Sequence, residues 1–289
     1  KCFEKVIELR PDLTRTLNNL GNILRVLGRP DEAILNYKKA ISIDPDFVEV
    51  YFNLGTTFQE LDQLDNAVKY YKKAIEINSN YHEAYNNLGV AYKDLKEFDS
   101  AIQAYQIAIR IKSDYAEAHN NIGIVFKELG QLDHAVKSHK TALKIIPEYA
   151  EAHNNLGIIL IEDKQLEKAI KRFEKSIAAD GNFIEAYNNL GSAHMELNNF
   201  DLSLENFQKA LKINPDYVEA HNNLGRLYMH LGQLNEAVQY FQKAIKINPN
   251  FEYAHNNLGL VYSDLGNLDK SAKCYKRAMD INPNYFEPC

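Results

Sequence analysis

The chain has no tryptophan and only three cysteines, three methionines and eight prolines among its 289 residues. The cysteines, Cys2, Cys274 and Cys289, are odd in number and form no Cys-x-x-Cys pair. They therefore support neither a disulfide framework nor a zinc site. Unpaired cysteines are typical of a reducing compartment, so we expect the protein in the cytoplasm or the nucleus.

The sequence also lacks long apolar runs and an excess of positive charge. No segment stays apolar over the roughly 20 residues that a membrane-spanning helix needs, and no signal peptide is recognisable. Lysine and arginine total 33 against 39 aspartates and glutamates, which gives a net charge of -6. Because an acidic surface attracts neither nucleic acid nor an anionic bilayer, we expect neither as a partner.

What the sequence does have is one tripeptide at a fixed spacing. Asn-Leu-Gly, with Ile in place of Leu once, returns every 34 residues without an insertion. Its glycines are Gly21, Gly55, Gly89, Gly123, Gly157, Gly191, Gly225 and Gly259. A constant period of this length indicates an array of stacked two-element units and not one or two globular domains.

We number each repeat from place 1 to place 34, with this glycine at place 8. The eight predicted repeats are 14–47, 48–81, 82–115, 116–149, 150–183, 184–217, 218–251 and 252–285. Residues 1–13 are then the second helix of a truncated repeat, and residues 286–289 begin a further one. Because the pattern is already under way at Lys1, we expect the chain to be a piece of a longer protein.

Each repeat is predicted to contain two helices. Apolar residues at helical spacing, such as Ala84, Leu88 and Ala91, mark a first helix over about places 1–14. A turn residue at place 15, often glycine, closes this helix. An acid at place 18, such as Asp65, is expected to cap a second helix that runs to about place 32, where proline often stands.

Small and aromatic residues alternate in a way that predicts close helix packing. Glycine at place 8 and Ala or Ser at places 20 and 27 allow the helices to approach, and aromatic residues at places 11 and 24 fill the remaining space. One repeat cannot cover its own apolar face. Stability is therefore expected from the contacts between successive repeats.

On these residues the chain resembles the tetratricopeptide repeat (TPR) family over essentially its whole length. In the seventh repeat the family pattern reads Leu224-Gly225, Tyr228, Ala237, Phe241 and Pro249. The resemblance implies an all-α fold, a right-handed TPR superhelical solenoid of antiparallel helix pairs. It also implies that the first helices line a concave groove and that the second helices form the convex wall.

The first helices carry an unbroken column of asparagines at place 6: Asn19, Asn53, Asn87, Asn121, Asn155, Asn189, Asn223 and Asn257. A carboxamide both donates and accepts hydrogen bonds, so it can bind a peptide backbone whatever the side chains of that peptide are. Neighbouring first helices about 10 Å apart are separated by somewhat more than two to three residues of extended chain at ~3.3 Å each, so the column can contact such a chain periodically. The column therefore predicts peptide binding. The alternative is that these asparagines only cap or bridge adjacent helices.

Acidic residues flank this column at two places of the first helix. Place 2 carries Glu83, Glu117, Glu151, Glu185 and Glu219 among others, and place 13 carries Asp94, Glu128 and Glu162. Lysines concentrate on the second helices, so the pattern predicts an acidic groove that binds neutral or basic extended segments. The alternative for place 2 is that an acid there only favours the start of the helix.

No catalytic or cofactor motif is recognisable, so we expect no enzyme activity, no metal and no cofactor. The prediction is a module that binds proteins or extended peptides. An unbroken 34-residue array with an asparagine column resembles the arm of O-GlcNAc transferase and of SPINDLY-type O-fucosyltransferases, which implies a substrate-presenting arm for a glycosyltransferase domain. The alternative is a structural scaffold or a self-assembling subunit that forms homo-oligomers through its end faces or convex wall.

Overall fold

The computed structural model describes residues 11–283, which form sixteen α-helices and no strand. The predictions for residues 1–10 and 286–289 fall outside this range, as do Cys2 and Cys289. The chain divides into two compact units, Lys1–Pro147 and Glu148–Cys289. Within each unit the helices are paired, which confirms the all-α repeat fold.

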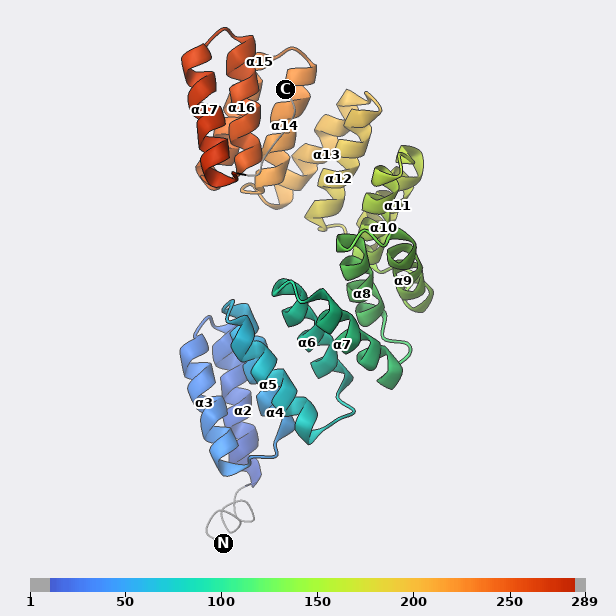
Figure 1. The fold of residues 1–289 in the computed structure, drawn as a ribbon, viewed down its shortest axis with the longest axis vertical. Coiled ribbons are helices and arrows are strands. Elements are labelled where there is room, and N and C mark those ends of the chain that lie inside the picture. Colours follow the sequence, from blue (N-terminus) through green and yellow to red (C-terminus); the bar gives the residue numbers. More distant parts are fainter. Residues whose placement is uncertain (1–10, 284–289) are drawn as a thin grey trace. The chain divides into compact units, whose positions relative to one another are not determined.

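The first unit contains four helix pairs (Figure 1). They are α2 (Pro11–Val26) with α3 (Pro30–Ile43), α4 (Val48–Glu60) with α5 (Leu64–Ile77), α6 (His82–Asp94) with α7 (Phe98–Ile111), and α8 (Ala116–Glu128) with α9 (Leu132–Ile145). Helix α2 begins at Pro11, so residues 11–13, which we expected at the end of the preceding helix, form its first turn. Proline is favourable at the first position of a helix because its fixed φ suits the helix and its missing N–H is not needed there.

The second unit contains four further pairs of the same kind. They are α10 (Ala150–Glu162) with α11 (Leu166–Ala179), α12 (Ile184–Glu196) with α13 (Phe200–Ile213), α14 (Val218–His230) with α15 (Leu234–Ile247), and α16 (Glu252–Asp264) with α17 (Leu268–Ile281). From α4 onward, the first helix of every repeat occupies places 1–13 and the second occupies places 17–30.

Two predicted helix boundaries are wrong. The second helices end at place 30, two residues before the prolines at place 32. They also begin at place 17, so the acid at place 18 lies inside the first turn instead of capping the helix. Of the eight residues that precede these helices, only Asn267 accepts a capping bond from a backbone N–H. The acid at place 18 therefore acts through its charge near the positive end of the helix.

The left-handed residue predicted at place 15 from glycine or asparagine in five repeats is confirmed there, and the other three repeats have the same conformation. Gly28, Gly130, Gly232 and Gly266 have φ between 70° and 72°. The other four repeats adopt the same conformation without glycine, with φ of 54° to 64° at Asp62, Lys96, Lys164 and Asn198. The left-handed conformation occurs even at residues whose side chain makes it energetically unfavourable. The packing of the two helices therefore determines the backbone conformation at place 15.

The two helices of a repeat meet where the glycine of place 8 faces the side chain of place 24. A Cβ atom added to Gly157 would lie 2.4 Å from Cε1 of Phe173, and the same contact in the other repeats ranges up to 2.9 Å. Distances this short exclude any residue larger than glycine unless the ring moves. The small residues at places 20 and 27, such as Ala67 and Ala74, are fully buried beside the same contact.

Successive repeats pack in a regular way within each unit. The second helix of one repeat contacts the first helix of the next, as α5 contacts α6 and α11 contacts α12. First helices also contact one another, as in α4 with α6 and α12 with α14. Clusters of buried apolar residues therefore extend from one repeat to the next, as expected of a stacked array, and Tyr92 packs against two of them.

The place-24 tyrosines differ in what their hydroxyls meet. Tyr71 donates to Oε1 of Gln59 at 2.8 Å and to Oγ1 of Thr56 at 3.4 Å. In the next repeat Val90 stands where Thr56 does, and the hydroxyl of Tyr105 is buried without a partner among the described residues. Burial raises the pKa of the Tyr105 hydroxyl. Tyr105 therefore carries a buried polar atom that contributes nothing to stability.

The fourth repeat has a histidine where the others have a phenol or phenyl ring. His139 is fully buried against Gly123 and its Nδ1 lies 2.9 Å from Oδ1 of Asn120. Its Nε2 is buried with no partner among the described residues. Burial, with a smaller effect of the positive charge on Lys127, lowers the pKa of His139 to about 4. The folded protein therefore holds this ring neutral.

Two matched substitutions test whether the hydroxyls of Tyr71 and Tyr105 differ in their contribution to stability. Tyr71→Phe should lower the free energy of unfolding by about 0.5–1.5 kcal/mol, because the hydrogen bonds to Gln59 and Thr56 are lost. Tyr105→Phe should leave stability unchanged or raise it by up to ~1 kcal/mol, because it removes an unpaired buried hydroxyl. Urea denaturation followed by circular dichroism measures both. Equal losses of unfolding free energy in the two variants would contradict the difference in hydrogen bonding between the two hydroxyls.

The buried histidine should make the protein sensitive to acid. An unfolded histidine takes up a proton near pH 6.5, whereas folded His139 does so only near pH 4. Stability is therefore lost as the pH falls between these values, by up to about 3 kcal/mol from this residue. In His139→Phe, the urea midpoint should fall less over that range than in the unsubstituted chain. Parallel pH curves for the two proteins would refute the prediction, since the carboxylates are common to both.

Candidate peptide-binding face of the first helices

Places 2, 6, 9 and 13 of each first helix form one face, which we call the first-helix face. The opposite side of these helices is buried, as Leu54 and Gly55 are in α4. On the first-helix face, places 2 and 13 are exposed in nearly every repeat, and places 6 and 9 are mostly half-buried. The predicted candidate residues therefore share a face that remains accessible in both units.

The place-6 asparagines form hydrogen bonds to a second column of asparagines, which we had not predicted from the sequence. Place 5 is also asparagine in seven repeats, and all seven side chains are buried: Asn18, Asn86, Asn120, Asn154, Asn188, Asn222 and Asn256. In five junctions, Nδ2 of the place-6 residue donates to Oδ1 of the place-5 residue in the repeat before. These bonds are Asn53–Asn18 (2.8 Å), Asn121–Asn86 (3.1 Å), Asn189–Asn154, Asn223–Asn188 and Asn257–Asn222 (2.9 Å each).

This geometry gives the place-6 asparagines the bridging role that we had considered as the alternative. The bridge uses one N–H of the amide, and the carboxamide has a second N–H and an acceptor oxygen besides. Asn223 is buried at 9% exposure, Asn19 is exposed, and the other six are half-buried. Bridging and ligand binding therefore use different atoms of the same group, and the predicted ligand role remains a prediction.

The place-2 acids have structural contacts of their own in the first unit. Oε1 of Glu117 accepts from Nδ2 of Asn86 at 2.9 Å, and Oε2 accepts from the hydroxyl of Tyr115 at 3.2 Å. Glu83 lies 3.0 Å from Nδ1 of His82. All five predicted place-2 acids also lie in the first turn of their helices, where negative charge is favourable. Both interpretations of place 2 therefore stand.

The acids at place 13 are partly neutralised in the first unit. Glu60 pairs with Arg25, Asp94 lies 3.0 Å from Lys93, and Glu128 lies 3.7 Å from Lys96. Arg25 and Lys93 stand at place 12 of their repeats. The first-helix face of this unit is therefore less acidic than the acids alone suggested.

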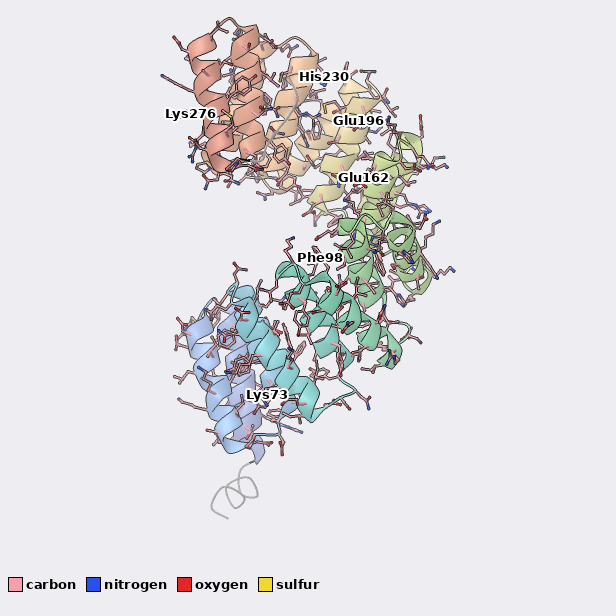
Figure 2. All side chains as sticks on the ribbon, in the orientation of Figure 1. Lys73, Phe98, Glu162, Glu196, His230 and Lys276 are labelled. Atoms are coloured by element: carbon pink, nitrogen blue, oxygen red, sulfur yellow. The ribbon has the colours of Figure 1, made fainter. Side chains whose placement is uncertain are left out.

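The second unit has no cation at the corresponding place 12, where Ile161, Met195, Met229 and Ser263 stand. Its first helices end at Glu162, Glu196 and His230, which Figure 2 labels, and at Asp264. Among residues 148–283, Glu196 makes no ion pair. The two units therefore offer a ligand different charge at the same place of the repeat.

The histidines of place 4 serve the fold. Nε2 of His119, His221 and His255 lies 3.1, 2.8 and 3.0 Å from the carbonyl oxygen of place 32 in the repeat before. These contacts tie the loop between two repeats to the next first helix. Residues 11–283 contain no group of three or more side chains arranged to hold a metal ion, and no helix there is long and apolar enough to cross a bilayer.

Comparison with known families gives one result along most of the chain. Models described as tetratricopeptide repeat match residues 48–81, 184–217, 218–251 and 252–285, residues 114–181 and residues 70–103. A model described as TPR repeat matches residues 21–62 and 91–130. No curated protein matches the chain significantly.

Solved structures share the fold at low sequence identity. The Cut9–Hcn1 hetero-tetramer of the APC/C matches 90% of this chain with a TM-score of 0.75 and 17% identity. The chain spans 51% of the length of that protein. PilF of Pseudomonas aeruginosa matches 71% of this chain and 93% of its own, with a TM-score of 0.61 and 20% identity. MamA is 29% identical over 56% of this chain and 95% of its own, with a TM-score of 0.47.

Proposed function

Because the chain belongs to the tetratricopeptide repeat family, whose members mediate protein–protein interactions, we propose that it binds extended polypeptide segments along its first-helix faces. The observation that carries this proposal is the pair of asparagine columns. A buried asparagine of one repeat holds the place-6 amide of the next, so that amide is fixed in position before a ligand arrives. A group that is already ordered loses less entropy when it binds.

The position of the amides suits a peptide main chain. In half-buried residues such as Asn189, the place-6 amide uses one N–H for its neighbour and offers its remaining polar atoms on an accessible face. Main-chain amides of an extended segment repeat every ~3.3 Å and can meet successive first helices at intervals of two to three residues. Such contacts favour extended segments of varied sequence over one particular sequence.

The charge of the face supports a neutral or basic ligand. Glu185 and Glu219 at place 2 and Glu196 at place 13 surround the asparagines in the second unit, where place 12 has no cation to neutralise them. In the first unit the place-13 acids Glu60, Asp94 and Glu128 are paired with cations, whereas Glu49 at place 2 makes no ion pair among the described residues. A basic segment of a ligand is therefore expected on the second unit, and on the first unit only beside place 2.

A finer proposal is that the chain is one part of a protein O-glycosyltransferase. The asparagine columns are compatible with the substrate-presenting arm of a protein O-glycosyltransferase, as the sequence resemblance implied. The reported structural neighbours do not include such an enzyme. The sequence of the full gene product tests this proposal directly, since the arm requires a glycosyltransferase domain in the same polypeptide.

Replacement of the place-6 asparagines tests the binding proposal. Asn121, Asn155 and Asn189 changed together to alanine should weaken binding of an extended peptide at least tenfold, because three main-chain anchors worth about 0.5–1.5 kcal/mol each are lost. The probe is a neutral 12-residue peptide selected against the chain by phage display. Fluorescence anisotropy measures its affinity, and thermal denaturation checks that the variant is folded.

The place-5 residue supplies the matched control. Asn188→Ala removes a buried bridge partner and should lower the melting temperature by several degrees, since it leaves the amide of Asn223 with only the longer bond of 3.4 Å to Oγ of Ser192. Its peptide affinity at a temperature where it is folded should change less than in the place-6 variant. Unchanged affinity in the triple variant would count against the proposal and leave the asparagines as purely structural bridges.

The alternative function is a scaffold or self-assembling subunit. It is favoured by apolar side chains exposed on α2, where Ile23 and Val26 are 58% and 81% exposed, on Leu27 directly after it, which is 64% exposed, and on α17, where Leu268 is 67% exposed. Light scattering over a concentration series should show a concentration-dependent mass if these faces associate. Charged substitutions at Val26 and Leu268 should then restore the monomer. A constant monomer mass would exclude self-assembly.

A further inference from the structure

The place-5 column is interrupted at one position. Phe52 stands in the second repeat where the seven other repeats have asparagine. Asn87, the place-6 residue of the third repeat, therefore has no carboxamide oxygen from the repeat before it. Instead, Oδ1 of Asn87 accepts a bond from Nδ2 of its neighbour Asn86 at 3.3 Å. The junction between the second and third repeats thus differs from the five bridged junctions in both its side chains and its hydrogen bonds.

Aromatic rings replace the missing bridge. The ring of Phe52 lies 5.8 Å from the buried ring of Tyr71 and 5.1 Å from the ring of Tyr81, measured between centroids. Tyr71 belongs to the core, whereas Phe52 and Tyr81 are both half-buried. Tyr81 directly precedes α6 and thus lies beside the first-helix face. Part of an aromatic surface is therefore accessible where the other repeats have a buried asparagine at place 5.

Two carboxylates stand beside these rings. Glu49 and Glu83 occupy place 2 of the second and third repeats. Burial raises the pKa of the Tyr81 hydroxyl to about 12, and the negative charges of Glu83 and Glu49 add to this effect. Both carboxylates therefore act on the hydroxyl that borders the aromatic surface. Glu83 lies 3.0 Å from Nδ1 of His82, and Glu49 makes no ion pair among the described residues.

We infer that Phe52, Tyr81, Glu49 and Glu83 form a subsite that binds an arginine side chain of the peptide ligand. A guanidinium group is planar and stacks on aromatic rings, and its N–H groups pair with carboxylates in a fixed geometry. A lysine has no flat face to stack, and an aliphatic residue would leave the carboxylates without a partner. This inference rests on the proposed function, because it assigns one side-chain position to a peptide that follows the place-6 amides.

The subsite also gives the bound peptide a fixed register. The asparagine columns are alike from repeat to repeat, so they allow the peptide to shift by one repeat. One arginine at the second and third repeats removes that freedom, because within residues 11–283 no other repeat combines an aromatic place-5 residue with place-2 acids.

The test uses the whole 289-residue chain and three blocked peptides. They are acetyl-Gly-Ser-Arg-Ser-Gly-amide and the same peptide with citrulline or lysine in place of arginine. Citrulline keeps the planar shape and loses the charge. In two-dimensional NMR titrations, the arginine peptide should shift the backbone amides around Phe52 and Tyr81. The citrulline peptide should bind there about fivefold or more weakly, because it lacks the cation–π and ionic attraction.

Variants of the chain separate the contribution of the Phe52 ring from that of the carboxylates of Glu49 and Glu83. Phe52→Asn supplies the residue that the other repeats carry at place 5, so the variant should fold and should lose the preference for arginine over citrulline. Phe52→Leu keeps an apolar side chain without the ring and should reduce this preference. Glu49→Gln with Glu83→Gln should abolish it. The matched control is Glu174→Gln with Glu236→Gln, which removes two exposed carboxylates from the second helices α11 and α15, outside the first-helix face, and it should leave the preference unchanged.

Each outcome decides between the two proposals. Equal binding of the arginine and citrulline peptides, or an unchanged preference in Phe52→Asn, would overturn the subsite. If the peptides shift place-6 amides along the first helices without such a preference, peptide binding stands and the subsite alone fails. If no amide of a first-helix face shifts with any peptide, the proposed function fails together with the subsite.

Discussion

The contact between a glycine of the first helix and a ring of the second determines the geometry of every repeat. At place 8 the ring of place 24 lies so close that a Cβ atom would overlap it, with separations of 2.4–2.9 Å. Since these separations are nearly the same each time, the two helices approach each other to a similar distance in every repeat. The helix pair is then a rigid unit, and whatever stands on its outer face is held at a reproducible position.

This constraint explains why the turn at place 15 keeps its conformation when its residue changes. Lys96 and Lys164 adopt a left-handed backbone that costs a side-chain-bearing residue about 1 kcal/mol, and glycine takes the same place in other repeats without that cost. The ring contact fixes both helices, so the connection between them has no freedom to relax. The chain also tolerates a buried histidine and an unpaired buried hydroxyl at place 24, because the shape of the ring matters there more than its chemistry.

The sequence predicted the period, the helix pairs, the glycine contact and the left-handed turn, because each depends on residues close together in one repeat. It did not predict the bridge between the asparagine columns. Asn53 and Asn18 are 35 residues apart, and the offset of one residue beyond the period arises only when two first helices are placed side by side. The signal was nevertheless present, as place 5 is asparagine in seven repeats. Likewise, the ion pair of Glu60 with Arg25 depends on the stacking of repeats, so the acids alone overstated the negative charge of the face.

The bridge and the proposed ligand contact are two consequences of one arrangement. A half-exposed amide beside solvent would sample several rotamers, and fixing it on binding would cost about 0.5–1.5 kcal/mol. The buried place-5 carbonyl oxygen fixes it during folding instead, as in Asn189 with Asn154. The repeat that lacks this oxygen has Phe52 there, and the ring surface and nearby carboxylates that it introduces are suited to recognising a side chain. A uniform column can hold a main chain but cannot distinguish one register from another, so an interruption is what a column of identical amides requires to become selective.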